Sequence, residues 1–203
     1  MRAIDIIHGD HRSIAAVLHG MLFLVREIRL RRRAPDFDVF GAMIYYIDAF
    51  PERFHHPKEE RLFQRLVERF AAGARDVERL SSEHRRGAEM IRTLEQALIR
   101  YENGGDTEFA TFADAVAAYA SFHWHHMRYE EDVLMPRART HLTASDWEEI
   151  DAMFAGNGDP LLGYAARAEY DKLFRRIVNL APPPIGVGPA SRDETTSATP
   201  RPA

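Results

Sequence analysis

Apolar residues recur along most of the chain at intervals of three and four, which is the spacing of one face of an α-helix. Such patterns cover residues 4–28, 36–72 and 74–102, and a fourth runs from about residue 106 toward Pro136. Four long amphipathic helices joined by short turns predict an all-α protein, an antiparallel up-down four-helix bundle.

Two features depart from this regular pattern. Pro51 and Pro57 lie inside the second predicted helix, and each removes a helical hydrogen bond, so we expect a kink or a short break there. Beyond the bundle, which we assign to residues 1–142, two shorter helical patterns predict a C-terminal helical extension over residues 143–181. Residues 182–203 are rich in Pro, Gly, Ser and Thr, and we predict a disordered tail.

The composition narrows the classes of function. The 203 residues include 27 basic and 31 acidic side chains, and the net charge of −4 argues against nucleic acid or an anionic membrane as a partner. Cysteine is absent, which excludes disulfides, thiol catalysis, iron–sulfur clusters and cysteine-bound zinc. No apolar run approaches the ~18 residues of a membrane span, and the first residues lack a signal-peptide core. We therefore expect a cytoplasmic protein.

One polar unit occurs twice on the hydrophobic faces of the predicted helices. It consists of a lone histidine on one helix and, on the next helix, a histidine followed four residues later by a glutamate. Side chains four residues apart lie one above the other on a helix, so both can reach the same metal centre. The six residues of the two units are His11, His55, Glu59, His84, His126 and Glu130.

A single histidine on an apolar face is more often a structural residue than a ligand. Two buried carboxylates change that balance, because an unpaired buried carboxylate costs several kcal/mol. The hydrophobic faces offer no lysine or arginine to pair with Glu59 and Glu130. A pair of divalent metals supplies the missing positive charge, and di-metal carboxylate bundles are built from inward-facing His and Glu.

Neighbouring residues are assigned by aligning the two halves. The alignment pairs His55 with His126, so we interpret His56 as a surface residue or a neighbour of the ligands. His123 lies one turn before His126 and is a candidate hydrogen-bond donor or a lining residue of an access path; a direct ligand is the less favoured alternative. Glu60 and Glu131 are most simply charges on the solvated face.

At these residues the sequence resembles the hemerythrin-like, HHE cation-binding family, over roughly residues 4–140. The pattern is similar to the H-HxxxE-H-HxxxE subgroup, found in bacteria and in an iron-sensing F-box protein. The resemblance implies a non-heme centre of two iron ions, oxo- or hydroxo-bridged when oxidised. It also implies that Glu59 and Glu130 bridge the irons and that the four histidines are terminal ligands.

The sequence departs from oxygen-carrying hemerythrins at one position. Those proteins have a fifth histidine one turn after the histidine of the third helix, where this chain has Ala88. The equivalent position in the first half is Ala15. Reversible oxygen carriage is therefore not expected, and both positions are candidates for open coordination.

The favoured function is binding or sensing of a small ligand (O₂, NO or peroxide), or of iron itself. A sensor would need a further protein partner, because no output domain is recognised. The alternatives are a peroxidase-, NO-reductase- or ferroxidase-like oxidoreductase and a protein of iron storage or delivery.

Overall fold

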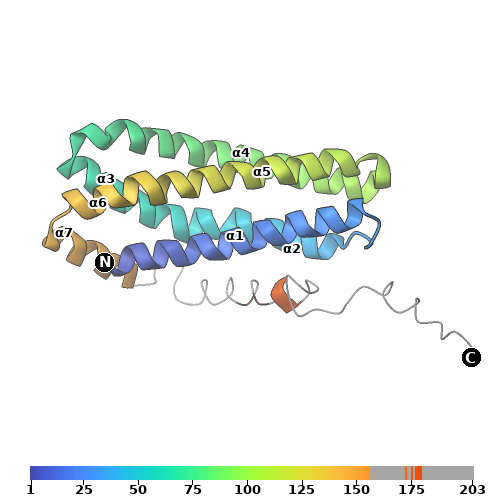
Figure 1. Cartoon of the computed structure of the whole chain (residues 1–203), viewed down its shortest axis with the longest axis horizontal. Coiled ribbons are helices and arrows are strands. Elements are labelled where there is room, and N and C mark those ends of the chain that lie inside the picture. The colour runs from blue at the N-terminus through green and yellow to red at the C-terminus, as the bar shows by residue number, and fades with distance from the viewer. Residues whose placement is uncertain (156–171, 173–174, 176, 180–203) are drawn as a thin grey trace, which may run out of the picture.

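The computed structural model describes residues 1–155, 172, 175 and 177–179. The helices of this part are α1 (Arg2–Arg29), α2 (Phe37–Phe50), α3 (His56–Arg69), α4 (Ala74–Gly104), α5 (Phe109–Tyr129), α6 (Met135–His141) and α7 (Ala144–Ala155). In Figure 1, α1, α2 with α3, α4, and α5 with α6 lie side by side, and the chain reverses direction at each connection. The described residues contain no strand. The predicted all-α class and helical bundle are confirmed.

The helix ends follow from local chemistry. Asp36 precedes α2, and its side-chain oxygen accepts a hydrogen bond from the backbone N–H of Val39 at 3.0 Å. Gly105 follows α4 with a φ of 65°, a conformation that favours glycine. Short 3₁₀ turns at Ala71–Gly73 and Gly105–Thr107 complete the connections to α4 and α5.

Each helix that carries a histidine–glutamate pair is interrupted by a π-helical turn. The first π-turn, Pro51–His55, separates α2 from α3 and confirms the break expected near Pro51 and Pro57. The second π-turn, Glu130–Leu134, separates α5 from α6. It contains no proline, so the sequence does not predict it. π-turns inside α-helices are frequent at functional sites.

The hydrophobic core consists of two clusters separated along the bundle. The larger cluster fills the half near the α1–α2 connection and includes Phe40, Ile47, Tyr101 and Phe112. The smaller cluster fills the other half and includes Ile4, Ile7, Leu62, Phe63, Leu134, Trp147, Ile150 and Phe154. The predicted ligands lie where the two clusters meet; on α1, for example, His11 lies between Ile7 of the smaller cluster and Ile14 of the larger cluster.

Helix α7 is tied to the bundle by polar contacts as well as by its apolar face. The backbone N–H of Thr143 donates to Asp146 and the backbone N–H of Asp146 donates to the Thr143 hydroxyl, which forms a capping box. Arg69 of α3 donates two hydrogen bonds of 2.9 Å to the same carboxylate. Asp151 accepts from the backbone N–H of Ala3 at the start of α1. The first part of the predicted extension thus packs directly on the bundle.

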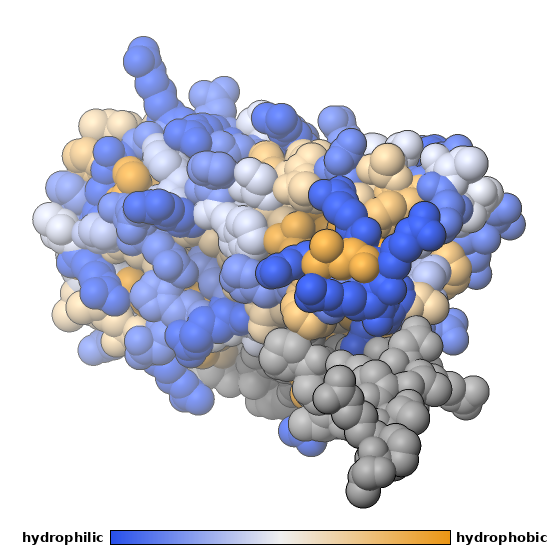
Figure 2. Space-filling view, turned by 45° about the vertical axis from the view of Figure 1, so that its right-hand side comes forward, coloured by the Kyte–Doolittle hydropathy of each residue, from blue (hydrophilic) through white to orange (hydrophobic). Residues whose placement is uncertain are grey.

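The sixth predicted helix and the predicted tail lie outside the described residues, except for residues 172, 175 and 177–179, which are helical. Within the described part, no helix combines the length and apolar character needed to cross a membrane. Figure 2 shows one face of the molecule, which is largely hydrophilic with apolar side chains gathered in a patch.

Candidate metal centre

The structure brings all six predicted ligands together. His11 comes from α1, His55 ends the first π-turn, and Glu59 follows it one turn into α3. Helix α4 contributes His84, and the other two residues are His126 of α5 and Glu130 at the start of the second π-turn. Five of the six residues are fully buried, and the side chain of His84 is 17% exposed.

Glu59 lies between the two pairs of histidines. Its Oε1 is 3.4 Å from Nε2 of His11 and 3.2 Å from Nε2 of His55. Its other oxygen, Oε2, is 3.8 Å from Nε2 of His84. One carboxylate therefore presents one oxygen to each histidine pair.

Glu130 repeats this arrangement from the opposite half of the chain. Its Oε2 is 3.1 Å from Nε2 of His11, and its Oε1 is 3.3 Å from Nε2 of His126 and 3.8 Å from Nε2 of His84. Four of these residues, His11, His55, Glu59 and Glu130, place ligand atoms within 4.8 Å of one another. The two carboxylates thus span the space between the His11–His55 pair and the His84–His126 pair.

The donor set fits a cation. All four carboxylate oxygens of Glu59 and Glu130 are buried, and none has a hydrogen-bond partner among the described residues. Lys58, which precedes Glu59, lies 3.8 Å from the carboxylate of Asp10. Buried carboxylates without partners are costly, whereas His and Glu are suitable ligands for iron and other first-row metals. The orphaned oxygens are what a metal centre would satisfy.

Two of the four histidines are hydrogen-bonded through Nδ1 to a carboxylate, and a third has a carboxylate nearby. Nδ1 of His11 is 2.8 Å from Glu131, Nδ1 of His126 is 3.1 Å from Glu83, and Nδ1 of His55 is 3.7 Å from Asp10. Such contacts fix the ring orientation and direct Nε2 toward the metal position. Asp10 and Glu83 each precede a lone histidine, so the repeat includes these supports, although their role was not predicted.

Glu131 is exposed, as interpreted, but its carboxylate also lies 2.8 Å from Nδ1 of His11, a contact that was not predicted. The equivalent residue in the first half, Glu60, is exposed and accepts a hydrogen bond from Gln64 at 3.3 Å. A sequence gives no means of separating these two glutamates, since they occupy the same position of the repeat. The symmetry between the halves therefore ends at this pair.

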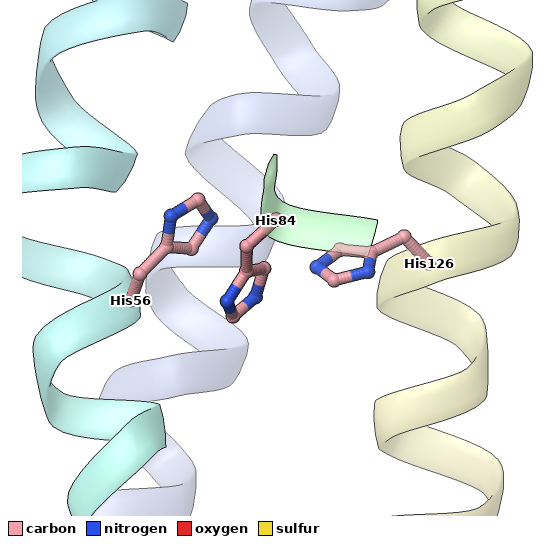
Figure 3. Close-up of side chains that lie close together, drawn as sticks. All are labelled: His56, His84 and His126. Carbon is pink, nitrogen blue, oxygen red and sulfur yellow. The ribbon is translucent and has the colours of Figure 1, made fainter. Parts of the chain in front are cut away.

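The fourth histidine, His84, packs against another histidine. The ring of His56 stacks on the ring of His84 with centroids 3.8 Å apart and planes 17° apart. Figure 3 shows His126 directed at His84 from the other side, and the three rings form a second group whose nitrogens lie within 4.8 Å of one another. His56 is half-buried, so the structure places it as a neighbour of a predicted ligand and not on the open surface.

The pKa values of the site residues are shifted because several carboxylates lie close together. Burial lowers the pKa of His11, but the neighbouring carboxylates of Glu130, Glu131 and Glu59 outweigh burial and raise it to about 12. The hydrogen bond from His126 lowers the pKa of Glu83 to about 2 against the opposing effect of burial. The carboxylates of the site thus favour positive charge at the position of His11.

His123 behaves differently from the histidines of the cluster. Burial, followed by the neighbouring His126 and His56, lowers the pKa of His123 to about 3, so the ring is neutral. Its Nε2 is buried and has no hydrogen-bond partner among the described residues. His123 also lines a small cavity together with His84, His56, Gly87 and Ala88. The structure therefore places it beside the cluster and close to an open space.

Comparison with known families decides the identity of the domain. The family model described as the hemerythrin HHE cation binding domain matches residues 2–138. The chain belongs to this family. The match includes all six predicted ligands of this hemerythrin domain and ends within α6. No curated protein and no solved structure matched the chain. A cation-binding family and a buried His/Glu cluster able to hold a metal thus agree.

Proposed function

We propose that this hemerythrin domain is a non-heme di-iron protein of the H-HxxxE-H-HxxxE subgroup that binds or senses O₂, NO or peroxide. The observation that carries the proposal is the placement of Glu59 and Glu130, each of which turns one buried oxygen toward each histidine pair. In the proposed site, His11 and His55 would hold one iron, His84 and His126 would hold the other, and Glu59 and Glu130 would serve both.

The proposed centre supplies redox chemistry toward small ligands, since iron held by His and carboxylate with open positions is typical of non-heme oxygen-reactive sites. The surrounding residues supply negative charge, orient the imidazole rings and exclude water. Glu131 and Glu83 hold the imidazoles of His11 and His126 so that Nε2 faces the centre. The two apolar clusters on either side limit access of water along the bundle.

Iron content tests the proposal. We expect two irons per chain in the wild type and a loss of at least one in the double variant Glu59→Gln, Glu130→Gln, which keeps the side-chain volume but removes both anionic bridges. The double variant Glu60→Gln, Asp132→Asn is the matched control, because it removes two exposed charges from the same segments. Iron content is measured by elemental analysis, with circular dichroism to verify folding. Two irons in the bridging variant would contradict the assignment.

The reaction of the reduced, iron-loaded protein distinguishes the proposed function from its alternatives. Stopped-flow spectra are recorded after mixing with O₂, H₂O₂ or NO. A stable adduct supports binding or sensing. Repeated turnover supports the oxidoreductase alternative, and release of iron supports storage or delivery.

A further inference from the structure

A small cavity lies directly beside His84. Its volume is about 10 Å³, which is sufficient for roughly one water molecule. His56 and His84 line one part of the cavity, and Gly87, Ala88 and His123 line another. The cavity is therefore adjacent to a proposed ligand of the second iron and contains the position where a fifth histidine is absent.

A polar atom without a partner points into this space. The His123 residue is only 6% exposed, and its Nε2 has no hydrogen-bond partner among the described residues. A Cβ atom added at Gly87 would lie 3.5 Å from this Nε2 and 3.4 Å from Cε1 of Phe122. The nitrogen thus faces the space that the glycine leaves open. A buried polar atom in this state needs a partner, and a small ligand would provide one.

The equivalent position of the other half is filled differently. Ala15, which corresponds to Ala88 in the repeat, packs against the larger hydrophobic cluster. The residue equivalent to Gly87 is Ile14, which is 3% exposed and belongs to the same cluster. The two halves of the site are therefore not equivalent in the space beside the lone histidine.

We propose that the cavity beside His84 binds the diatomic ligand, and that His123 donates a hydrogen bond from Nε2 to it. This inference rests on the proposed function and specifies which iron is open. The neutral imidazole donates in its Nε2–H tautomer, and Gly87 provides the space for the ligand. His123 is a positioning residue in this arrangement and does not hold the metal.

Nitric oxide bound to the anaerobically reduced, iron-loaded full chain is the probe. Iron content is measured first in the wild type, in His123→Leu and His123→Gln, and in His125→Leu, an exposed histidine of α5 that serves as the control. The N–O stretching frequency in H₂O and D₂O reports the hydrogen bond directly. We expect a solvent-isotope shift in the wild type and the control, none in His123→Leu, and a partial return in His123→Gln, whose amide can donate from a similar position.

The rate of NO dissociation gives a second readout. Loss of one hydrogen bond should accelerate dissociation about tenfold in His123→Leu. Gly87→Ala, which suits a helix better than glycine does, should weaken NO binding while iron content stays at two. Two irons with unchanged N–O frequency, isotope shift and dissociation in His123→Leu, or unchanged NO affinity in Gly87→Ala, would overturn the inference alone. A wild type without iron would overturn the proposed function as well.

Discussion

Glu131 and Glu60 have the same place in the repeat but different surroundings. Glu131 lies 2.8 Å from the ring of His11, whereas Glu60 accepts a hydrogen bond from Gln64 on the surface. Supporting carboxylates of metal-bound histidines typically affect metal affinity 10–100-fold. We therefore expect Glu131→Gln to weaken iron binding by about this factor and Glu60→Gln to leave it nearly unchanged. Competition with a coloured chelator measures both affinities, and equal values for the two variants would contradict the structure.

At the same scale, the sequence could identify the ligands but not their supports. The spacing of His55 and Glu59 recurs in the second half and places polar side chains on an apolar helix face. An ordinary solvent-exposed helix has no need of this pattern. Glu131 and Glu83 follow no such rule, because a charged residue beside a buried one is usually turned to solvent. Which charged side chain contacts a histidine depends on how neighbouring helices pack. The residues next to it in the sequence do not determine that packing.

Among the elements, α7 is attached to the bundle by specific polar contacts. Asp146 completes the capping box with Thr143 and receives two hydrogen bonds from Arg69. Replacing it with alanine leaves cap donors and a guanidinium without their acceptor. We expect Asp146→Ala to reduce the free energy of unfolding by roughly 1–3 kcal/mol at neutral pH. Thermal unfolding measures the effect, and the exposed Glu148→Ala on the same helix is the control.

The effect of Asp146 should depend on pH with a defined sign. The hydrogen bonds from Arg69 lower the pKa of Asp146 below its ordinary value of 3.8, despite the opposing effect of burial. A lowered pKa in the folded state means that the stabilisation is present above pH 3.8 and is lost as pH falls through the lower folded value. The melting temperatures of the wild type and Asp146→Ala should therefore converge in strong acid. A difference that persists there would show that packing, and not charge, sets the effect.

Some helix starts and breaks could be predicted from short stretches of the sequence. The capping residue Asp36 and the break near Pro51 were predictable, since a cap and a proline act within a few residues. The second π-turn was not predictable, because Glu130–Leu134 has the composition of an ordinary helix.

For the whole molecule, the important feature is a polar layer that divides the core. Glu59 and Glu130 lie between two hydrophobic clusters, and without metal their oxygens have no hydrogen-bond partner among the described residues. A metal that binds only the folded state should add about 2.7 kcal/mol of stability when free iron exceeds the dissociation constant 100-fold. For a chain of this size we expect the melting temperature to rise by roughly 5–10 °C. Calorimetry of the apo and iron-loaded forms measures the difference, and coincident transitions would count against a structural contribution of the metal.

The second π-turn has an implication for how this family can vary. A π-turn holds one residue more than a regular helical turn, while α5 and α6 on either side keep their faces toward the core. The extra residue is equivalent to a local insertion, and its loss would restore a regular helix without changing the phase of either flank. Removal of one residue between Glu130 and Leu134 should therefore disturb the packing of the flanking helices little. The same change within α4, which has no such turn, would rotate every later side chain of that helix by about 100°.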